Sequence, residues 1–207
     1  MTNRIFVWVI LAGLFASATT LAGPFTAEKL VQLDRVGAPV LSQDGTKLVY
    51  TLRTTDMAAN KGTYDLWWTG VSDGDTHRLT THKANDTDPA WSADGKSVYF
   101  LSSRSGTSQV WRIALDGGEA TQVTDLPVDI GTFKPTPGGD SLVLSAGVYL
   151  DCENLACTAS RDEAQKESPT SGVLYEQLFM RHWDHWLNVK HSQLFALELD
   201  ENGVGAG

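Results

Sequence analysis

Apolar and polar residues alternate along most of the chain, and the alternation recurs. The clearest stretch is 88–102, where a polar run leads into a tight turn at Asp94-Gly95 and then into an alternating apolar segment. An Asp-Gly pair between apolar runs predicts a hairpin, because Gly accepts the positive φ that the turn needs. The pattern also stands about 50 residues earlier, at 36–50, and more weakly about 44 residues later, at 133–144. The recurrence indicates a repeat protein built from short strands.

Each repeat unit reads as four short strands. The strands expected in the first unit are 35–41, 48–52, 64–71 and 76–79. The second unit aligns with the first, with Leu66-Trp67-Trp68 over Val110-Trp111-Arg112. Four strands in about 40 to 50 residues is the period of a propeller blade. Before these units, residues 25–33 carry apolar residues at helical spacing, and Thr26 is a suitable N-cap, so one short helix is expected there.

The third unit is interrupted. Its first strands are expected near 132–133 and 142–149 and its third at 193–200, with an insertion of about 40 residues, at about 150–190, between them. The insertion holds both cysteines and a charged, helix-like segment at 161–167. The predicted fold is therefore all-β: an incomplete propeller over 23–207, with two complete four-stranded blades and most of a third. The expected blades are 35–83, 84–127 and 128–207.

Such a ring would be open. Propellers use about four to eight blades, and each blade needs a neighbour on both faces. We therefore expect the chain to be the first portion of a longer protein, or a piece that assembles with other chains. By itself it would expose an apolar blade face and a sheet edge, so we expect aggregation or partial unfolding of the isolated chain.

The first 22 residues read as a signal peptide. Arg4 is a short positive region, 5–14 is apolar, and Thr20-Leu21-Ala22 has small residues where a signal peptidase cleaves. The alternative is a membrane anchor, although the apolar run is shorter than the roughly 20 residues that a span takes. Export predicts a periplasmic or secreted protein. The net charge of −9 comes without any basic run, so nothing indicates a nucleic-acid partner.

Export also bears on the two cysteines. Cys152 and Cys157 are the only cysteines of the chain, and they lie in a polar, acidic stretch. In an oxidising compartment a local disulfide is favoured. The alternative is a metal-binding pair, but two thiolates without two further ligands nearby make a poor zinc site. We therefore expect no metal and no cofactor.

The repeat motifs bring in a family resemblance. The segments 88–96 (DPAWSADGK) and 102–106 (SSRSG) resemble the WD40-like repeat of periplasmic propellers. Two groups share that repeat: the Tol-system propeller proteins, and the N-terminal propeller of prolyl oligopeptidase family serine peptidases. Within the insertion, 150–157 and 178–186 (LFMRHWDHW) resemble the bacterial dipeptidyl-peptidase V and acylaminoacyl-peptidase-like branch.

The resemblance implies a C-terminal α/β-hydrolase domain with a Ser-His-Asp triad, its Ser in a Gly-x-Ser-x-Gly elbow. The closest approach here, 106–110 (GTSQV), lacks the second Gly, and no triad residue can be assigned. This chain alone is therefore expected to lack peptidase activity. In the parent enzyme it would gate the access of short peptides to a domain that removes dipeptides or acyl-amino acids. The alternative is a Tol-type protein-binding module, and a homo-oligomer stays open in either case.

The insertion supplies the candidate binding residues. These are Arg181, His182, Trp183, Asp184 and Trp186, and an Arg beside an Asp could orient a peptide terminus or carbonyl. The alternative is structural, with an Arg-Asp pair and two Trp side chains fixing the insertion against the blade. His182 and His185 could also form a metal pair with Asp184 or His191.

One aromatic position recurs in all three units. Trp67, Trp111 and Phe195 occupy it, and large residues repeated at one strand position are typical of the core between blades. A row of binding-site aromatics is the alternative.

Overall fold

The computed structural model describes residues 23–37, 39–170, 181–182, 185–186, 190–200 and 203–205, with backbone alone at 181–182 and 185–186. The expected signal peptide lies outside these residues. Among them, no helix is both long and apolar enough to cross a membrane.

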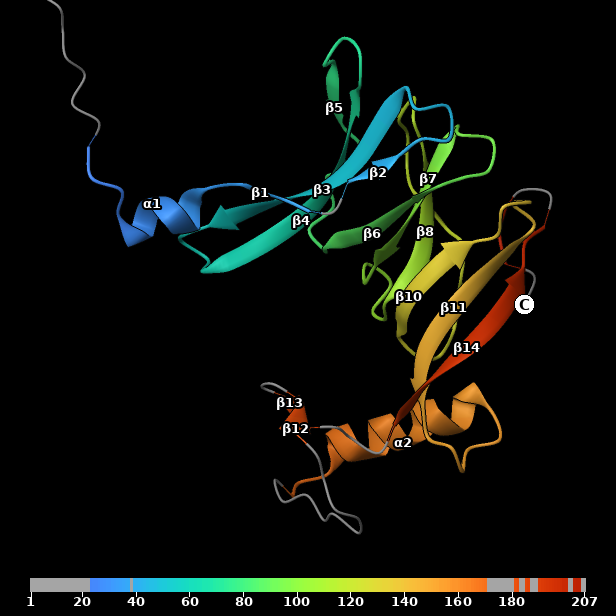
Figure 1. The fold of residues 1–207 in the computed structure, drawn as a ribbon. Coiled ribbons are helices and arrows are strands. Elements are labelled where there is room, and N and C mark those ends of the chain that lie inside the picture. The colour runs from blue at the N-terminus through green and yellow to red at the C-terminus, as the bar shows by residue number, and fades with distance from the viewer. Residues whose placement is uncertain are drawn as a thin grey trace, which may run out of the picture.

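The described residues form three larger antiparallel sheets, which follow one another along the chain (Figure 1), and one two-stranded hairpin. The first sheet contains β1 (Arg35–Val36), β2 (Val40–Leu41), β3 (Lys47–Asp56), β4 (Lys61–Gly70) and β5 (Thr76–Arg78). The second contains β6 (Asp86–Trp91), β7 (Ser97–Ser102), β8 (Gln109–Ala114) and β9 (Thr121–Gln122). The third contains β10 (Ile130–Pro135), β11 (Ser141–Val148) and β14 (His191–Glu198). Each sheet is an antiparallel array of strands that lie close together in the sequence, as in propeller blades, so the predicted all-β partial propeller is confirmed.

The turn between the first two long strands of each unit is built in the same way. Gly45, Gly95 and Gly139 adopt φ of 70°, 66° and 75°. In the first turn the Asp44 carboxylate accepts hydrogen bonds from the Ser42 hydroxyl (2.6 Å) and from both the backbone N–H (3.0 Å) and the hydroxyl (2.9 Å) of Thr46. These bonds, that from Ser42 first, lower the pKa of Asp44 to about 2. Local side-chain chemistry thus fixes the hairpins that the sequence predicted.

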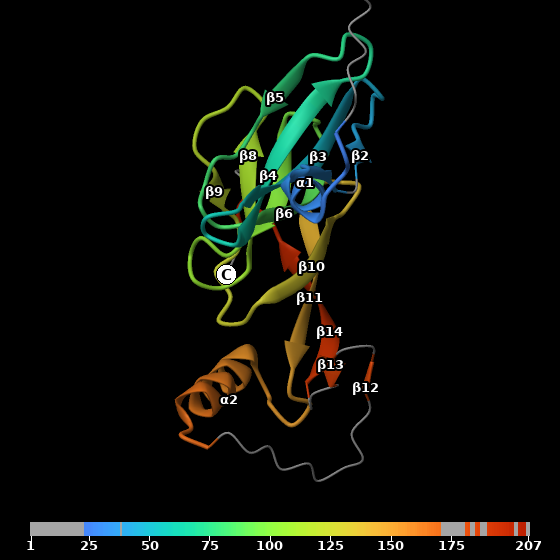
Figure 2. The same ribbon diagram turned by 90° about the vertical axis from the view of Figure 1, so that its left-hand side faces the viewer.

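The sheets pack face to face through two apolar clusters, with the second sheet in the middle (Figure 2). One cluster joins the first and second sheets and is centred on Val49, Leu66, Trp91, Val98, Phe100 and Ile113. The other joins the second and third sheets and includes Tyr99, Leu101, Val110, Phe133, Leu142 and Leu144. Because side chains alternate along a strand, β7 supplies both clusters, one from each face.

The first expected strand differs from the sequence prediction. The strand expected at 35–41 is two short strands, β1 and β2, that both pair with β3. Pro39 lies between them, and it has no N–H to continue the ladder.

The short N-terminal helix is confirmed as α1 (Ala27–Gln32), capped by the Thr26 hydroxyl, which accepts a hydrogen bond from the N–H of Lys29.

The helix in the insertion is longer than expected. α2 spans Leu155–Glu167, whereas the charged pattern indicated only 161–167. The N-cap is Asn154, whose side-chain oxygen accepts a hydrogen bond from the N–H of Cys157 at 2.9 Å. An Asn whose side chain caps the N–H three residues later is a sequence signal for the start of a helix. The prediction used only the charged residues, so it missed this signal.

Candidate functional site

Three of the five candidate binding residues, Arg181, His182 and Trp186, lie in the strands of a small hairpin of the insertion. β12 (Arg181–His182) pairs with β13 (His185–Trp186), with Arg181 opposite Trp186 and His182 opposite His185. Trp183 and Asp184 lie outside the described residues. The backbone pairing places Arg181 and Trp186 on one face of this hairpin, and a role in binding stays a prediction.

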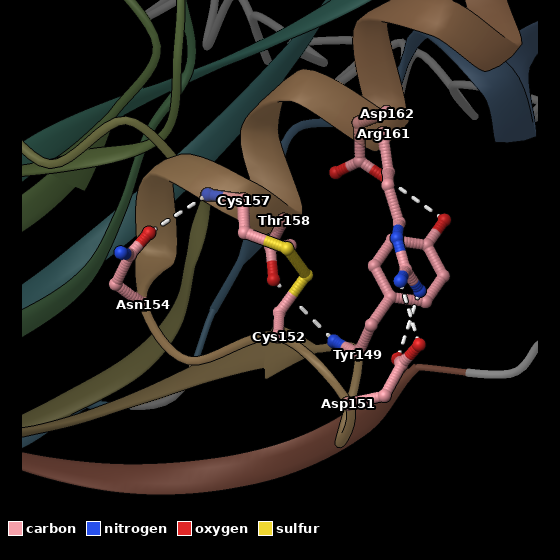
Figure 3. Close-up of a disulfide and its surroundings, with 8 residues drawn as sticks. All are labelled: Tyr149, Asp151, Cys152, Asn154, Cys157, Thr158, Arg161 and Asp162. Atoms are coloured by element: carbon pink, nitrogen blue, oxygen red, sulfur yellow. Dashed lines mark hydrogen bonds and ion pairs between the residues drawn. A yellow bond between two sulfur atoms is a disulfide. The ribbon is translucent and has the colours of Figure 1, made fainter.

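The segment that leads from β11 into the insertion is closed by a disulfide (Figure 3). Cys152 and Cys157 are bonded, as the sequence predicted. The bridge joins the turn after β11 to the first turn of α2, beside the Asn154 cap. Next to it, the fully buried hydroxyl of Thr158 accepts a hydrogen bond from the N–H of Tyr149 at 3.4 Å. The start of α2 is therefore fixed to the end of β11.

Tyr149 then ties both ends of the insertion together. Two cations lie close to its ring, with the Arg161 guanidinium 5.1 Å and the Lys190 ammonium 5.8 Å from the ring centroid. Its hydroxyl donates to Asp162 at 3.2 Å, and Lys190 reaches the same carboxylate at 2.8 Å. Burial and then the Asp162 charge raise the pKa of Tyr149. We name Tyr149, Arg161, Asp162 and Lys190 the stem cluster, because it joins the outgoing and returning ends of the insertion.

A second ion pair braces the same helix from outside. Arg161 donates to both oxygens of Asp151, at 2.8 and 2.6 Å (Figure 3). These hydrogen bonds lower the pKa of Asp151, and both side chains are well exposed. The bidentate geometry orients the Arg161 guanidinium for its contact with Tyr149, although an exposed pair adds little stability by itself.

A groove of about 460 Å³ lies between the first and second sheets. It is lined by the loop after β5, by the loop between β7 and β8, by side chains of β8 and by the turn after β8. The lining residues are Leu79, Thr80, Thr81, His82, Arg104, Trp111, Ile113, Gly118, Glu119 and Ala120. Arg104 donates to both carboxylate oxygens of Asp86 at 2.8 Å and to the Ser102 hydroxyl at 3.1 Å. The Arg104 guanidinium lies 5.2 Å from the centroid of the Phe100 ring and 5.0 Å from that of Trp111.

The electrostatics of this groove favour structure over ligand capture. The Asp86 carboxylate is fully buried, and its ion pair with Arg104 compensates the buried charge. The Arg104 guanidinium is therefore engaged with Asp86 and does not face a ligand unpaired. Asp65 lies nearby, and burial raises its pKa, with the Asp86 charge adding to the effect and Arg78 at 2.7 Å opposing it. The sequence did not single out the Asp86–Arg104 pair, although Arg104 lies in the SSRSG motif.

The recurring aromatic position is structural in two of its three copies. Trp111 packs against the cluster between the first and second sheets, and Phe195 against the cluster between the second and third. Trp67 pairs with Tyr50 on the face of the first sheet that points away from the second sheet. The recurring aromatic residue therefore packs into the core in the second and third sheets, where a preceding sheet lies against it.

The described residues also contain no cluster of three or more metal-binding side chains. Ser108, in the nearest approach to a nucleophile elbow, lies just before β8 and donates its hydroxyl hydrogen to the carbonyl of Ile130 at 3.0 Å. An elbow needs a strand followed directly by a helix, which this segment is not.

Comparison with known proteins places the chain among propellers. It is 27% identical over 171 residues to dipeptidyl-peptidase 5 of Porphyromonas endodontalis, covering 83% of this chain and 24% of that protein. It is 28% identical over 179 residues to dipeptidyl-peptidase 5 of Porphyromonas gingivalis, covering 86% of this chain and 25% of that protein. The chain thus spans about a quarter of the length of these relatives.

Among solved structures, the AtxE2 isopeptidase aligns with 89% of this chain and 32% of its own, with a TM-score of 0.61 and 20% sequence identity, a likeness of fold. The family model described as the TolB beta propeller domain matches residues 28–168. That match covers more than half of the chain, and the chain therefore belongs to the TolB β-propeller domain family.

Proposed function

We propose that this chain is the propeller segment of an exported serine peptidase that removes dipeptides or acyl-amino acids from short peptides. The observation that carries the proposal is the similarity to two dipeptidyl-peptidase 5 proteins over more than four fifths of the chain. The described residues hold no nucleophile elbow, so the chemistry would reside in an α/β-hydrolase domain.

The propeller's role in this proposal is to restrict which substrates reach that domain. The stem cluster and the disulfide support it, because a loop that narrows an entrance has to be held in a fixed place. The hairpin with Arg181 and Trp186 would then contact the peptide.

A chimera tests the proposal. This chain would replace the matched segment of Porphyromonas endodontalis dipeptidyl-peptidase 5, and folding would be checked by circular dichroism. We expect the chimera to hydrolyse a dipeptidyl chromogenic substrate and to leave a long unstructured peptide uncut, whereas this chain alone should hydrolyse neither. A folded chimera that cuts both substrates equally would contradict gating. A folded chimera without any activity would contradict the peptidase role.

The family model favours a second candidate, a Tol-type module that binds proteins and has no associated catalysis. It differs in what continues the coding sequence. The peptidase proposal expects a Gly-x-Ser-x-Gly elbow downstream, and a stop codon after a closed set of blades would favour the binding module.

A further inference from the structure

A buried carboxylate stands in the first repeat unit where the second unit has an amide. Asp65 of β4 occupies the position that Gln109 occupies in β8. Both residues are buried, with Asp65 4% and Gln109 0% exposed. In each unit the next backbone N–H donates to a threonine hydroxyl in the loop that leads to the following sheet, Thr80 or Thr124, at 2.9 Å. The two side chains therefore lie in equivalent places.

The Gln109 amide fixes the loop after β9 with both of its ends. Its NH2 group donates to the carbonyls of Leu126 and Val128, at 3.0 and 3.1 Å. Its oxygen accepts from the Thr124 hydroxyl at 2.8 Å and from the N–H of Leu126 at 3.0 Å. An amide can do this because it is both a donor and an acceptor and carries no charge.

The Asp65 carboxylate makes fewer contacts than Gln109. Its Oδ2 atom accepts a hydrogen bond from Arg78 at 2.7 Å, whereas its Oδ1 atom is buried and has no hydrogen-bond partner in the described part of the chain. An ionised carboxylate only accepts hydrogen bonds, so it cannot bond loop carbonyls in the way that Gln109 does. A buried acceptor without a partner also destabilises the fold.

A second buried carboxylate lies close to Asp65. The N–H of Tyr64 donates to the side chain of Asn85 at 3.2 Å, which brings the residues that follow them, Asp65 of β4 and Asp86 of β6, near each other. Burial raises the pKa of Asp65, and the fully buried Asp86 charge raises it further. Arg104 is bound to both oxygens of Asp86.

The other elements around Asp65 supply one further partner and two charged or titratable groups. Arg78 of β5 lowers the pKa of Asp65, but its side chain is 43% exposed to water. The loop after β5 carries His82 and Lys83, and the residue of β3 opposite Asp65 is the apolar Leu52. Burial outweighs Arg78, so the pKa of Asp65 lies above its ordinary value of 3.8.

We propose that Asp65 is a proton switch for the loop 79–85, which connects the first two sheets. When the carboxylate takes a proton from the solvent, its new O–H is a donor and the group becomes neutral, like the Gln109 amide. It then donates to a carbonyl of the loop, as Gln109 does in the second unit. Residues 79–82 line the groove between the first and second sheets, so mild acid would fix one wall of that groove. The inference does not depend on the peptidase proposal.

The direction of the effect follows from the raised pKa of Asp65. In the folded chain the carboxyl group keeps its proton at a pH at which the unfolded chain has lost it. The protonated group therefore stabilises the fold as the pH falls toward 3.8, and this stabilisation is lost as the pH rises through the raised pKa. Asp44 acts in the opposite direction, because its pKa is lowered.

Hydrogen exchange of the loop amides tests the proposal, measured by mass spectrometry on the folded chain from about pH 8 down to about pH 5. Asp65→Asn is neutral throughout, and comparison with the wild type at the same pH cancels the intrinsic pH dependence of exchange. At the upper end we expect the wild-type loop to exchange about tenfold faster than the variant, the factor for a pKa raised by about one unit. At the lower end the two rates should agree. A ratio that stays constant over the range would overturn the proposal.

Two more variants keep the test decisive. Asp65→Gln introduces the residue of the second unit, and its loop should stay protected at every pH; exchange as fast as in the wild type at the upper end would contradict the proposal. His82 also titrates in the loop, and its ring accepts from the N–H of Ala84 at 3.0 Å. His82→Asn should therefore keep the wild-type pH response. If that response disappeared, the switch would be His82, and the assignment to Asp65 would be wrong.

Discussion

The buried ion pair between Asp86 of β6 and Arg104 of the loop after β7 should be the polar contact of the second sheet that is most sensitive to substitution. Asp86 is fully buried, and its carboxylate receives its described side-chain hydrogen bonds from Arg104, at 2.8 Å to each oxygen. The Arg104 side chain is only 13% exposed, so solvent screens the pair weakly. Arg104→Met keeps apolar contact with the rings of Phe100 and Trp111 while it removes the charge.

The expected loss of folding stability follows from the Asp86 carboxylate, which Arg104→Met leaves buried without its partner. Removing one partner of a buried pair costs about 3–5 kcal/mol, because the other charge stays buried without compensation. At about 2–4 °C per kcal/mol for a chain of this size, the melting temperature should fall by about 6–20 °C. The double variant Asp86→Leu/Arg104→Met should regain most of this loss, because it leaves no unpaired charge.

Urea unfolding followed by tryptophan fluorescence measures the effect, since Trp91 and Trp111 both pack between these two sheets. Arg161→Met is the matched control. Its pair with Asp151 is equally short but exposed, so the change should be much smaller. If Arg104→Met lost less than about 1 kcal/mol, the value of a surface pair, the reasoning from burial would be refuted.

Three further changes have defined outcomes. Cys157→Ser should destabilise the start of α2 by about 2 kcal/mol, seen as faster hydrogen exchange there; unchanged exchange would show that the Asn154 cap suffices. Asp44→Asn should make the stability of the folded chain depend less on pH in the acid range. The lowered pKa of Asp44 gives stability that is present above its ordinary value of 3.8 and is lost as the pH falls toward about 2. Melting curves over that pH range check this, and Glu153→Gln serves as a control for the loss of one negative charge. Leu144→Ala, in the core at 1% exposure, should cost about 2–5 kcal/mol by urea unfolding, whereas Val143→Ala on the exposed face should cost far less.

Much of the fold was predictable because its determinants are local. An Asp or Ser side chain and a Gly with positive φ make each hairpin turn within about five residues, and alternation along each strand then decides which side chains share a face. The period of these turns was enough to predict a propeller. With only two cysteines in the chain, the disulfide had one available pairing, and the structure contains it.

The tertiary structure decided what depends on residues far apart in the chain. Trp67 and Trp111 occupy the same repeat position, yet only Trp111 packs against a preceding sheet, because burial depends on a neighbour and not on the residue. Asp86 meets Arg104 only after β6 and β7 have paired, and Lys190 meets Tyr149 only after the insertion returns to β14. Charge compensation and burial are properties of folded distances, so a pattern along the sequence cannot assign them.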